Sequence, residues 1–267
     1  MSKLAAATVV ITGAAGGFGQ ELTQQLLAKG SHLILTDHPK SKLSERIEAI
    51  APTLAKQPGK VLATLDIDLA DAAGCDQLYA EIKQRDFVPD ILINNAGLAL
   101  VGNMVDIPTD RWTTMMQVNL LTPMQLSSRF AADMRARRQG HIVNISSLAG
   151  WIAPPSLTAY AASKYGLRGF SEGLRYELAT YDVKVTTVYP FFSRTPLLQS
   201  PRFGTLAESD QALPAVLTTD PKKIMAKTIR AIERNQAEVF PDQVAWLGQG
   251  LKRYFPFALN WLGQIKV

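Results

Sequence analysis

The stretch "TVVITGAAGGFGQELTQQLLAKG", residues 8–30, decides the fold of this 267-residue chain. It begins with an apolar, β-branched run, "TVVIT" at 8–12, that is typical of a buried strand. It ends in a helical segment, where Leu22 and Leu26 lie four residues apart and Gly30 suits the position after the last turn. The glycine-rich loop "TGAAGGFG", 12–19, joins the two. This order of strand, loop and helix predicts a dinucleotide-binding unit.

Each glycine of this loop has a physical reason to be there. Gly13 allows a sharp turn, and Gly17 and Gly19 leave room where the backbone approaches a phosphate and packs on the sheet. The helix that follows offers unpaired N–H groups and a positive dipole end to a pyrophosphate. We assign these glycines and Phe18, which lies between two of them, to cofactor binding. A loop that merely turns is the alternative, and the flanking strand and helix argue against it.

The alternation of strands and helices continues along the chain. Further strands are expected at 32–37, 60–67, 90–97, 140–147, 183–190 and 237–241, and further helices at 41–51, 72–85, 111–138, 159–179 and 221–235. The strands are continuous apolar runs, which indicates a parallel sheet covered on both faces. The fold class is therefore α/β, with a doubly wound, Rossmann-like parallel sheet and a single domain over 1–267. Pro123 predicts a kink or a break in the helix at 111–138.

Composition narrows the class of protein. Hydrophobic residues make up 47% and charged residues 19%, as in a soluble globular domain. Cys75 is the only cysteine and the three histidines are scattered, so neither a disulfide nor a metal site is expected. The first apolar run ends in the glycine-rich loop and does not resemble a signal peptide, and no run reaches the ~20 apolar residues of a membrane span. We expect a cytoplasmic protein.

The chain is basic, with a net charge of +5 and a pI of about 9.3. A nucleic-acid partner is one explanation of such a balance. The cations form only one tight cluster, "RARR" at 135–138, so we favour a scattered basic surface and a site for an anionic cofactor. No nucleic-acid partner is expected.

Asp37 bears on the choice between NAD and NADP. It ends the second expected strand, 18 residues after Gly19, where an acid binds the adenosine ribose hydroxyls and repels an added phosphate. NAD is therefore favoured. Lys40 and Lys42 lie close by and are able to accept a 2′-phosphate, so NADP is not excluded, and a plain turn residue is a further alternative for Asp37.

The end of the third strand offers contacts to the adenine. Asp66 is assigned to the adenine amino group and Ile67 to packing beside the ring. Asp68 is an alternative to Asp66.

The segment "TAYAASKYGL", 158–167, holds two tyrosines beside one lysine. Lys164 lies four residues after Tyr160, so both face the same side of a helix, whereas the adjacent Tyr165 points about 100° away. A free tyrosine has a pKa near ~10 and is a poor base at neutral pH. A neighbouring ammonium, aided by the positive charge of an oxidised nicotinamide, is expected to stabilise the phenolate and lower that pKa. Tyr160 is thus a candidate acid/base, and Tyr165 is left a packing role.

Ser147 lies 13 residues before Tyr160, at the end of the fifth strand. Its hydroxyl is suited to hydrogen-bonding a substrate oxygen and stabilising the charge that builds there. Its neighbour Ser146 should point to the other side of the strand.

These residues together resemble the short-chain dehydrogenase/reductase family. "TGAAGGFG" is similar to its TGxxxGxG loop, "NNAG" at 94–97 to its fourth-strand motif, and "YAASK" to its YxxxK pair, and Ser147 and Asn119 occur in the matching order. The resemblance implies hydride transfer between a nicotinamide and a secondary alcohol or ketone. It implies a catalytic set of Asn119, Ser147, Tyr160 and Lys164, in which the Asn119 backbone holds a water on the proton path.

The resemblance also implies further cofactor contacts and an assembly. The contacts fall on Asn95, Ala96, Gly97, Tyr160, Lys164, Pro190 and Thr195. The chain departs from the family pattern in "YPFFSRTP", where Phe191 stands in a position that is often glycine. The family forms dimers or tetramers, so a homodimer or homotetramer is expected, with the helices at 111–138 and 159–179 in the interface.

Two apolar segments remain. The region 193–220 is long and lacks periodicity, which predicts a lid over a lipophilic alcohol or ketone. The tail 242–267 is expected to pack within the subunit or against another one. Peripheral membrane contact is its second explanation, because aromatic residues lie beside basic ones there. The aromatic residues are Trp246, Tyr254, Phe255, Phe257 and Trp261, and the basic ones are Lys252, Arg253 and Lys266. Pro256 interrupts any long helix in this tail.

We therefore expect an NAD-dependent oxidoreductase with Tyr160 as its acid/base. The alternative is a non-catalytic, NAD(H)-binding regulator on the same fold. The intact set of Tyr160, Lys164 and Ser147 argues against that alternative.

Overall fold

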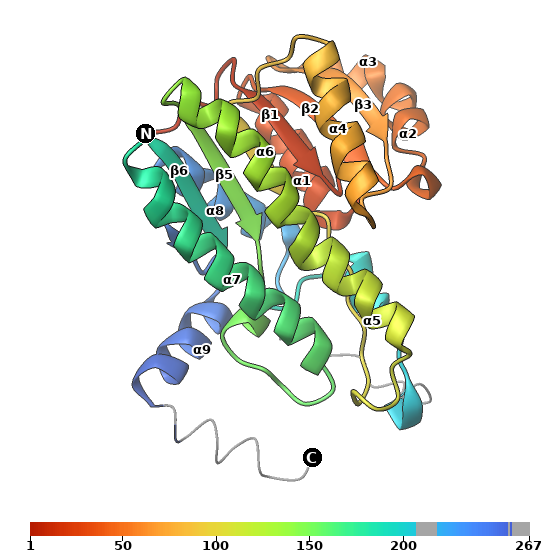
Figure 1. Cartoon of the computed structure of the whole chain (residues 1–267). Helices are drawn as coiled ribbons and strands as arrows, with labels where there is room; N and C mark the ends of the chain where they lie inside the picture. Colours follow the sequence, from red (N-terminus) through yellow and green to blue (C-terminus); the bar gives the residue numbers. More distant parts are fainter. Residues whose placement is uncertain (207–217, 256, 258–267) are drawn as a thin grey trace.

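The computed structural model describes residues 1–206, 218–255 and 257. Within them, seven parallel strands form one sheet in the order β3-β2-β1-β4-β5-β6-β7 (Figure 1). The strands are β1 (Thr8–Thr12), β2 (His32–Asp37), β3 (Lys60–Asp66), β4 (Ile91–Asn94), β5 (Gly140–Ile145), β6 (Val183–Val188) and β7 (Glu238–Val239). The predicted doubly wound, Rossmann-like sheet is confirmed, and the chain is a single domain.

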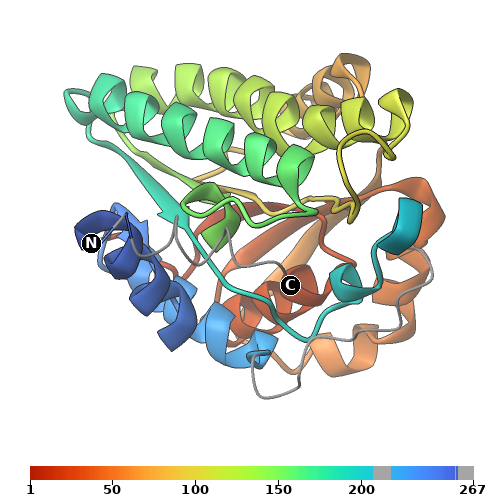
Figure 2. The same ribbon diagram turned by 90° about the horizontal axis from the view of Figure 1, so that it is seen from below.

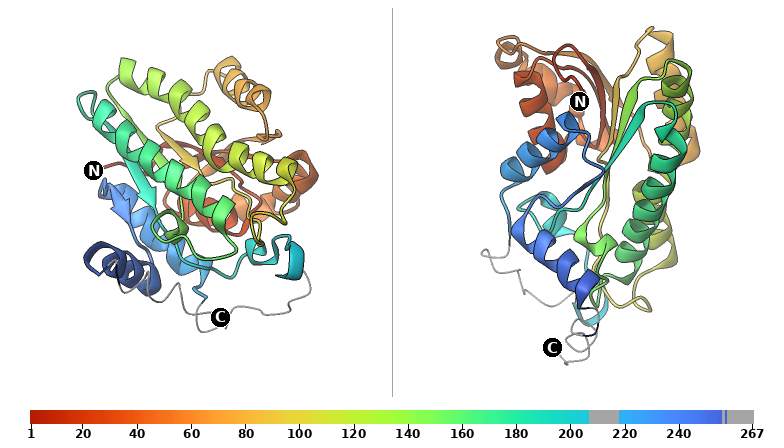
Figure 3. Two further views of the ribbon diagram at one scale, coloured as in Figure 1. Left: turned by 60° about the horizontal axis from the view of Figure 1, so that its bottom comes forward. Right: turned by 90° about the vertical axis from the view of Figure 1, so that its left-hand side faces the viewer.

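Helices cover both faces of the sheet, as the two-sided apolar strands require (Figures 2 and 3). The larger helices are α1 (Gly17–Ala28), α4 (Ala72–Gln84), α5 (Thr109–Met116), α6 (Thr122–Ala136), α7 (Thr158–Ala179), α8 (Pro221–Glu233) and α9 (Gln243–Tyr254), with the short α2 (Leu43–Ala49) and α3 (Ala51–Leu54) before β3. Helices α1 and α8 share one apolar core with the sheet, and α4, α6 and α7 share the other.

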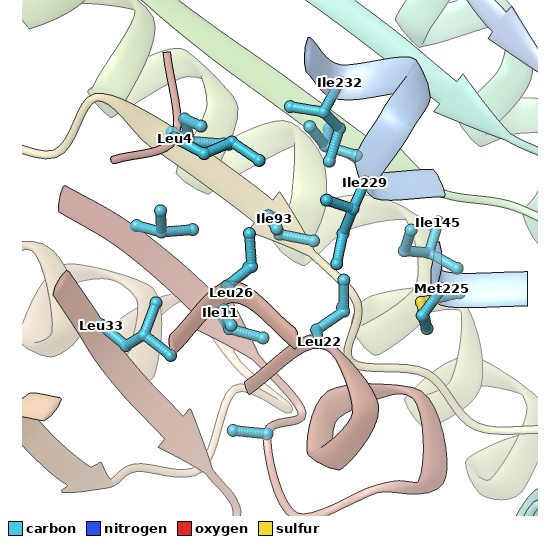
Figure 4. Close-up of a cluster of buried hydrophobic side chains, with 14 of the residues drawn as sticks. Leu4, Ile11, Leu22, Leu26, Leu33, Ile93, Ile145, Met225, Ile229 and Ile232 are labelled. Carbon is cyan, nitrogen blue, oxygen red and sulfur yellow. The ribbon is translucent and has the colours of Figure 1, made fainter. Parts of the chain in front are cut away.

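The two cores follow from the alternation of side chains along β1. Val9 and Ile11 face the core under α1 and α8, and Val10 faces the core under α4 and α6. Figure 4 shows Leu26 of α1 and Ile229 of α8 in the first core. Burial on both faces explains why the strand sequences are apolar without interruption.

The predicted helix at 111–138 neither breaks nor runs as a plain α-helix. It continues from α5 to α6 through a wider π-helical turn, Gln117–Leu121, which ends two residues before Pro123. Proline lacks an N–H, and its ring crowds the carbonyl four residues earlier, so a wider turn relieves both problems. That carbonyl belongs to Asn119.

The regions assigned as lid and tail lie partly outside the described residues. The described part of the lid carries short turns at Pro196–Gln199 and Gly204–Leu206, and Arg202 pairs with Val101 in an isolated parallel bridge. In the tail, α9 is described, whereas Pro256, Trp261 and Lys266 fall outside the description. Among the described residues, no helix has the length and apolar character needed to cross a membrane.

Candidate active site

The candidate site lies at the carboxyl ends of β1, β4 and β5. The strand order reverses between β1 and β4, and such a switch point is where doubly wound sheets bind ligands. The glycine-rich loop follows β1, Asn95 follows β4, and Ser147 lies just past β5.

The loop geometry explains its glycines. Gly13 has φ +66°, and a Cβ there would lie 2.7 Å from the Cα of Ala96. A Cβ on Gly19 would lie 2.1 Å from the carbonyl oxygen of Gly13. The α1 N-terminus carries neither a capping side chain nor an acid in its first turn. The residues present therefore suit a cofactor diphosphate.

Thr12 joins the loop to the end of β4, a role that sequence reasoning missed. Its hydroxyl accepts hydrogen bonds from the backbone N–H groups of Asn95 and Ala96, each at 3.0 Å. The Asn95 amide in turn donates to the carbonyls of Thr12 and Gly13, at 2.9 and 3.0 Å. A buried threonine at the end of a strand, directly before the first glycine, was the signal available.

Asp37 reaches the loop from β2. Its Oδ2 accepts a hydrogen bond from Ala15 N at 2.8 Å, and its Oδ1 accepts one from His38 N at 2.7 Å. The carboxylate thus stands beside the glycine-rich loop, the position expected for a ribose-binding acid. Lys42, considered for a 2′-phosphate, forms an ion pair with Glu45 at 3.2 Å.

The adenine contacts assigned at the end of β3 remain predictions. Asp66 Oδ1 accepts from Leu43 N at 3.1 Å, and Asp68 lies 3.4 Å from His38 Nε2. Ile67, expected beside the ring, is only 2% exposed and packs in the core with Cys75 and Leu78. Its side chain therefore contributes mainly to the packing of the core.

Lys164 is a buried lysine with few partners. It is 4% exposed, and its Nζ donates to the carbonyl of Ile145 at 3.1 Å. Burial lowers the pKa of Lys164 to about 8. A Cβ on Gly97 would lie 3.7 Å from this nitrogen, so the glycine after β4 keeps the space beside the ammonium open.

Tyr160 lies one helical turn before Lys164, as predicted. The Lys164 ammonium is 5.7 Å from the centre of the Tyr160 ring. Burial raises the pKa of Tyr160 to about 12, and a hydrogen bond with Ser147 offsets part of that rise. We expected Lys164 and an oxidised nicotinamide together to lower this pKa; without the cofactor, removal of the phenol from water is the largest influence and raises it.

Ser147 and Tyr160 are brought together by β5 and α7. Ser147 Oγ accepts from Ala149 N at 3.1 Å, and it lies 3.5 Å from the carbonyl oxygen of Pro190, the outer limit of a hydrogen bond. Ser146 turns the other way and donates to the carbonyl of Lys164 at 3.1 Å. The predicted opposite orientation of the two serines is confirmed.

Asn119 occupies the π-helical turn, and its side chain is fully engaged. Its Oδ1 accepts from Leu98 N at 2.8 Å, and its Nδ2 donates to Leu98 O at 2.9 Å and Ser163 Oγ at 3.1 Å. Ser163, which sequence reasoning missed although it lies inside "YAASK", donates to the carbonyl of Tyr160 at 2.7 Å. Pro123 has no N–H, so the Asn119 carbonyl lacks the usual donor four residues later.

The segment after β6 supplies Pro190 and Thr195. A Cβ on Gly17 would lie 2.7 Å from Thr195 Cγ2, so the threonine lies against the glycine-rich loop. Phe191 stands where the family often has glycine, yet it is not among the residues with positive φ, so a side chain is tolerated there. The buried Asp242 accepts a hydrogen bond from Phe191 N at 2.9 Å, a contact that sequence reasoning missed.

The remaining candidates have structural roles. The Tyr165 hydroxyl donates to the carbonyl of Trp151, away from Lys164. Both ring nitrogens of His141 bond hydroxyl groups at the other end of the sheet, and Cys75 is buried and free. No group of three potential metal ligands occurs in the part of the chain that the structure describes.

Comparison with known proteins identifies the family. The family profile described as short chain dehydrogenase matches residues 7–203. The chain belongs to the short-chain dehydrogenase/reductase family.

Individual relatives and solved structures share between about one fifth and two fifths of their residues with this chain. Dehydrogenase/reductase SDR family member 7B of Bos taurus is 37% identical over 194 residues, 72% of this chain and 59% of that protein. The chain thus spans about three fifths of that relative's length. A short-chain dehydrogenase/reductase from Burkholderia phymatum, solved with NAD, has a TM-score of 0.80 at 21% identity, with 97% of each chain covered. A short-chain dehydrogenase from Burkholderia cenocepacia, solved with NADP, has a TM-score of 0.80 at 21% identity, covering 99% of this chain and 100% of that one. These two likenesses concern the fold alone.

Proposed function

We propose that this protein is a nicotinamide-dependent oxidoreductase that interconverts a secondary alcohol and a ketone. The observation that carries the proposal is the convergence of Tyr160, Ser147 and Lys164 beside Gly97, at the edge of the sheet that also holds the glycine-rich loop. Family membership supports the same reaction class.

The chain's own residues suit a dinucleotide along this edge. The diphosphate would lie over the glycine-rich loop and the N-terminus of α1, with Thr195 and Pro190 on its other side. Asn95 and Ala96 would border the nicotinamide end, and Asp37 the adenosine ribose. When bound, the nicotinamide supplies or accepts the hydride.

NAD is the cofactor that the site favours. The Asp37 carboxylate beside Ala15 would repel a 2′-phosphate, and Lys42 is already paired with Glu45. Of the two lysines considered, exposed Lys40 is the one that would bind the 2′-phosphate of NADP. Activity confined to NADP would overturn this assignment.

The proton chemistry follows from the two pKa values. With a pKa of about 12, Tyr160 is protonated at neutral pH and can donate to a ketone oxygen that Ser147 holds. In the reverse direction the phenol must lose its proton. That step needs nearby positive charge, which Lys164 contributes while it is protonated, below its pKa of about 8. The Asn119 backbone would hold a water that passes protons from Lys164 toward solvent.

A lipophilic substrate fits the apolar surroundings of Tyr160. Trp112 and Phe203 pack with Tyr160 against a small buried cluster of Leu100, Ile107, Met115 and Ala159. Phe203 belongs to the segment assigned as the lid, and its N–H donates to the carbonyl of Val101 at 2.9 Å. We propose that this segment covers the substrate and excludes water.

The assembly is a homodimer or homotetramer through α5, α6 and α7. Figure 1 shows α6 and α7 side by side across one face of the molecule. Large side chains are exposed on these helices or the turn between them, namely Leu121, Met124, Tyr165 and Tyr176. Burial of this face against a second copy would cover them.

Tyr160→Phe tests the function, with Tyr165→Phe as its matched control. Turnover of a panel of ketones and alcohols, followed by the absorbance of the reduced cofactor, should be abolished in the first variant and retained in the second. Calorimetry should show that both variants still bind NADH. Unchanged turnover in Tyr160→Phe would refute the acid/base assignment, and NADH binding without turnover of any substrate by the wild type would favour the regulatory alternative.

A further inference from the structure

A row of cations follows the outer face of α8. Lys223, Lys227, Arg230 and Arg234 recur at spacings of four, three and four residues, which places them along one side of a helix. All four are exposed, and no ion pair engages them among the described residues. The opposite side of α8 is buried in the core (Figure 4).

Helix α9 lies beside this row and exposes several large apolar side chains on its outer side. Its inner side packs through Ala245 onto Leu148. Trp246 and Leu247 are each 61% exposed, and the end of the helix adds Tyr254 at 70% and Phe255 at 65%. Figures 2 and 3 show α8 and α9 on the same side of the molecule. Exposed apolar groups on this scale mark an interaction surface.

The two helices border a common hollow. Lys227, Arg230 and Arg234 line it from α8 and Trp246 lines it from α9, around a volume of about 460 Å³. Arg230 and Arg234 also line a second hollow of about 640 Å³, which the first five residues of the chain and Lys29 border. Five cations and two carboxylates line the two hollows: Lys3, Lys29, Lys227, Arg230, Arg234, Glu233 and Glu238.

The two carboxylates do not neutralise the row. Glu233 is paired with Lys29 at 2.7 Å. Glu238 accepts a hydrogen bond from the Tyr189 hydroxyl at 3.0 Å and keeps its charge, but it faces Lys227, Arg230 and Arg234 in the same hollow. The surface therefore keeps its positive charge next to exposed aromatic side chains.

We propose that this face, defined by the α8 cations and the outer side of α9, docks on an anionic lipid bilayer. Lysine and arginine beside tryptophan, tyrosine and phenylalanine on a surface helix match a headgroup layer with acyl chains beneath it. A second copy of the chain is disfavoured, because a two-fold contact would bring the cation row against itself. A nucleic acid would leave the aromatic end of α9 without a role.

Docking is independent of the proposed catalytic chemistry, although the two are neighbours. Gly248 of α9 lies against Leu148, whose turn begins at Ser147. A lipophilic substrate held in the bilayer would therefore be close to the side of the protein that carries Ser147. Vesicle binding is measured without turnover, so failure of one proposal leaves the other testable.

The test is co-sedimentation of the full chain with vesicles of phosphatidylcholine, with or without phosphatidylglycerol. Wild type should sediment with the anionic vesicles only, and less at high salt. Each basic residue near an anionic surface contributes about fivefold to binding, so Arg230→Glu with Arg234→Glu should reduce it by about 30-fold or more. Lys56→Glu with Lys60→Glu makes the same change of charge near the opposite edge of the sheet, and should bind like wild type.

The apolar part is tested by Trp246→Ser with Leu247→Ser, which should weaken vesicle binding by about tenfold or more. Circular dichroism and NADH binding report that each variant is folded. The proposal is overturned if wild type ignores anionic vesicles at low salt, or if the Arg230 and Arg234 variant binds them unchanged. It is also overturned if that variant instead loses duplex-DNA binding or self-association in sedimentation, with no vesicle binding in the wild type.

Discussion

The two edges of the sheet both bury polar side chains, but they use them differently. At the amino edge, His141 Nδ1 lies 2.9 Å from Ser2 Oγ and Nε2 lies 2.8 Å from Thr186 Oγ1, so both nitrogens are satisfied. At the carboxyl edge, Lys164 has three N–H donors, and the described residues offer it the carbonyl of Ile145. A complete hydrogen-bond network stabilises the fold, whereas spare donors on a buried group indicate a site that binds a ligand or takes part in a reaction.

Lys164→Met tests the functional role of the carboxyl edge. We expect turnover to fall by about 10²–10⁴-fold, because the phenol of Tyr160 loses its neighbouring charge. The free energy of unfolding should change little or rise, since a buried ammonium with spare donors costs more to desolvate than a thioether. Steady-state kinetics and urea unfolding measure the two effects. A loss of stability that accounts for the loss of turnover would make Lys164 a structural residue.

At the amino edge, His141 should contribute to the stability of the fold, and this contribution should depend on pH. Burial lowers its pKa to about 3 from 6.5, so the unfolded chain binds the extra proton first as the pH falls. The stability that depends on the neutral ring is fully present above pH ~6.5 and is lost toward lower pH, at up to ~1.4 kcal/mol per pH unit. Urea unfolding between neutral and mildly acidic pH should show this slope.

The control is His141→Gln, which keeps a donor and an acceptor but does not titrate. Its stability should be flatter over the same pH range, and its turnover at neutral pH should resemble that of wild type. An unchanged slope in this variant would mean that another group is responsible.

The sequence predicted the carboxyl edge better than the amino edge, for a physical reason. Glycines at 12–19 and the spacing of Tyr160 and Lys164 are local patterns, and the chemistry of a cofactor limits what can stand there. β1 and β2 were predicted with the bounds that the structure shows. The His141 network joins residues 139 and 45 positions apart, and no local pattern encodes such pairings.

The errors have the same origin. Helical spacing revealed Lys164 beside Tyr160 but not the depth of burial, which raises the pKa of Tyr160 before any cofactor is bound. Pro123 correctly marked an irregular helix, but the pattern did not say whether the irregularity is a kink, a break or a π-helical turn. Asp242 reads as an ordinary helix cap, and only folding brings its second oxygen to Phe191, 51 residues earlier.

Asp242→Ala should produce an intermediate effect that links α9 to the cofactor edge. The carboxylate accepts from Ala245 N at 2.8 Å and from Phe191 N at 2.9 Å. Loss of both bonds should cost about 2 kcal/mol in the free energy of unfolding. If Asp242 positions the segment from Pro190 to Thr195, KM for the cofactor should rise more than kcat falls. Asp242→Asn, which keeps one acceptor, should recover part of both; an unchanged KM would leave Asp242 only a cap of α9.

Tyr165→Phe should have the smallest effect on turnover and stability, and it compares two tyrosines of the same helix. Tyr160 and Tyr165 both stand close to Lys164 in sequence, but the Tyr165 hydroxyl already donates to the carbonyl of Trp151 and the side chain is 37% exposed. Water can replace that bond, so the free energy of unfolding should fall by less than ~1 kcal/mol. Turnover and its pH profile should stay as in wild type. A Tyr165→Phe enzyme as inactive as Tyr160→Phe would show that helical spacing and the Ser147 contact had selected the wrong tyrosine.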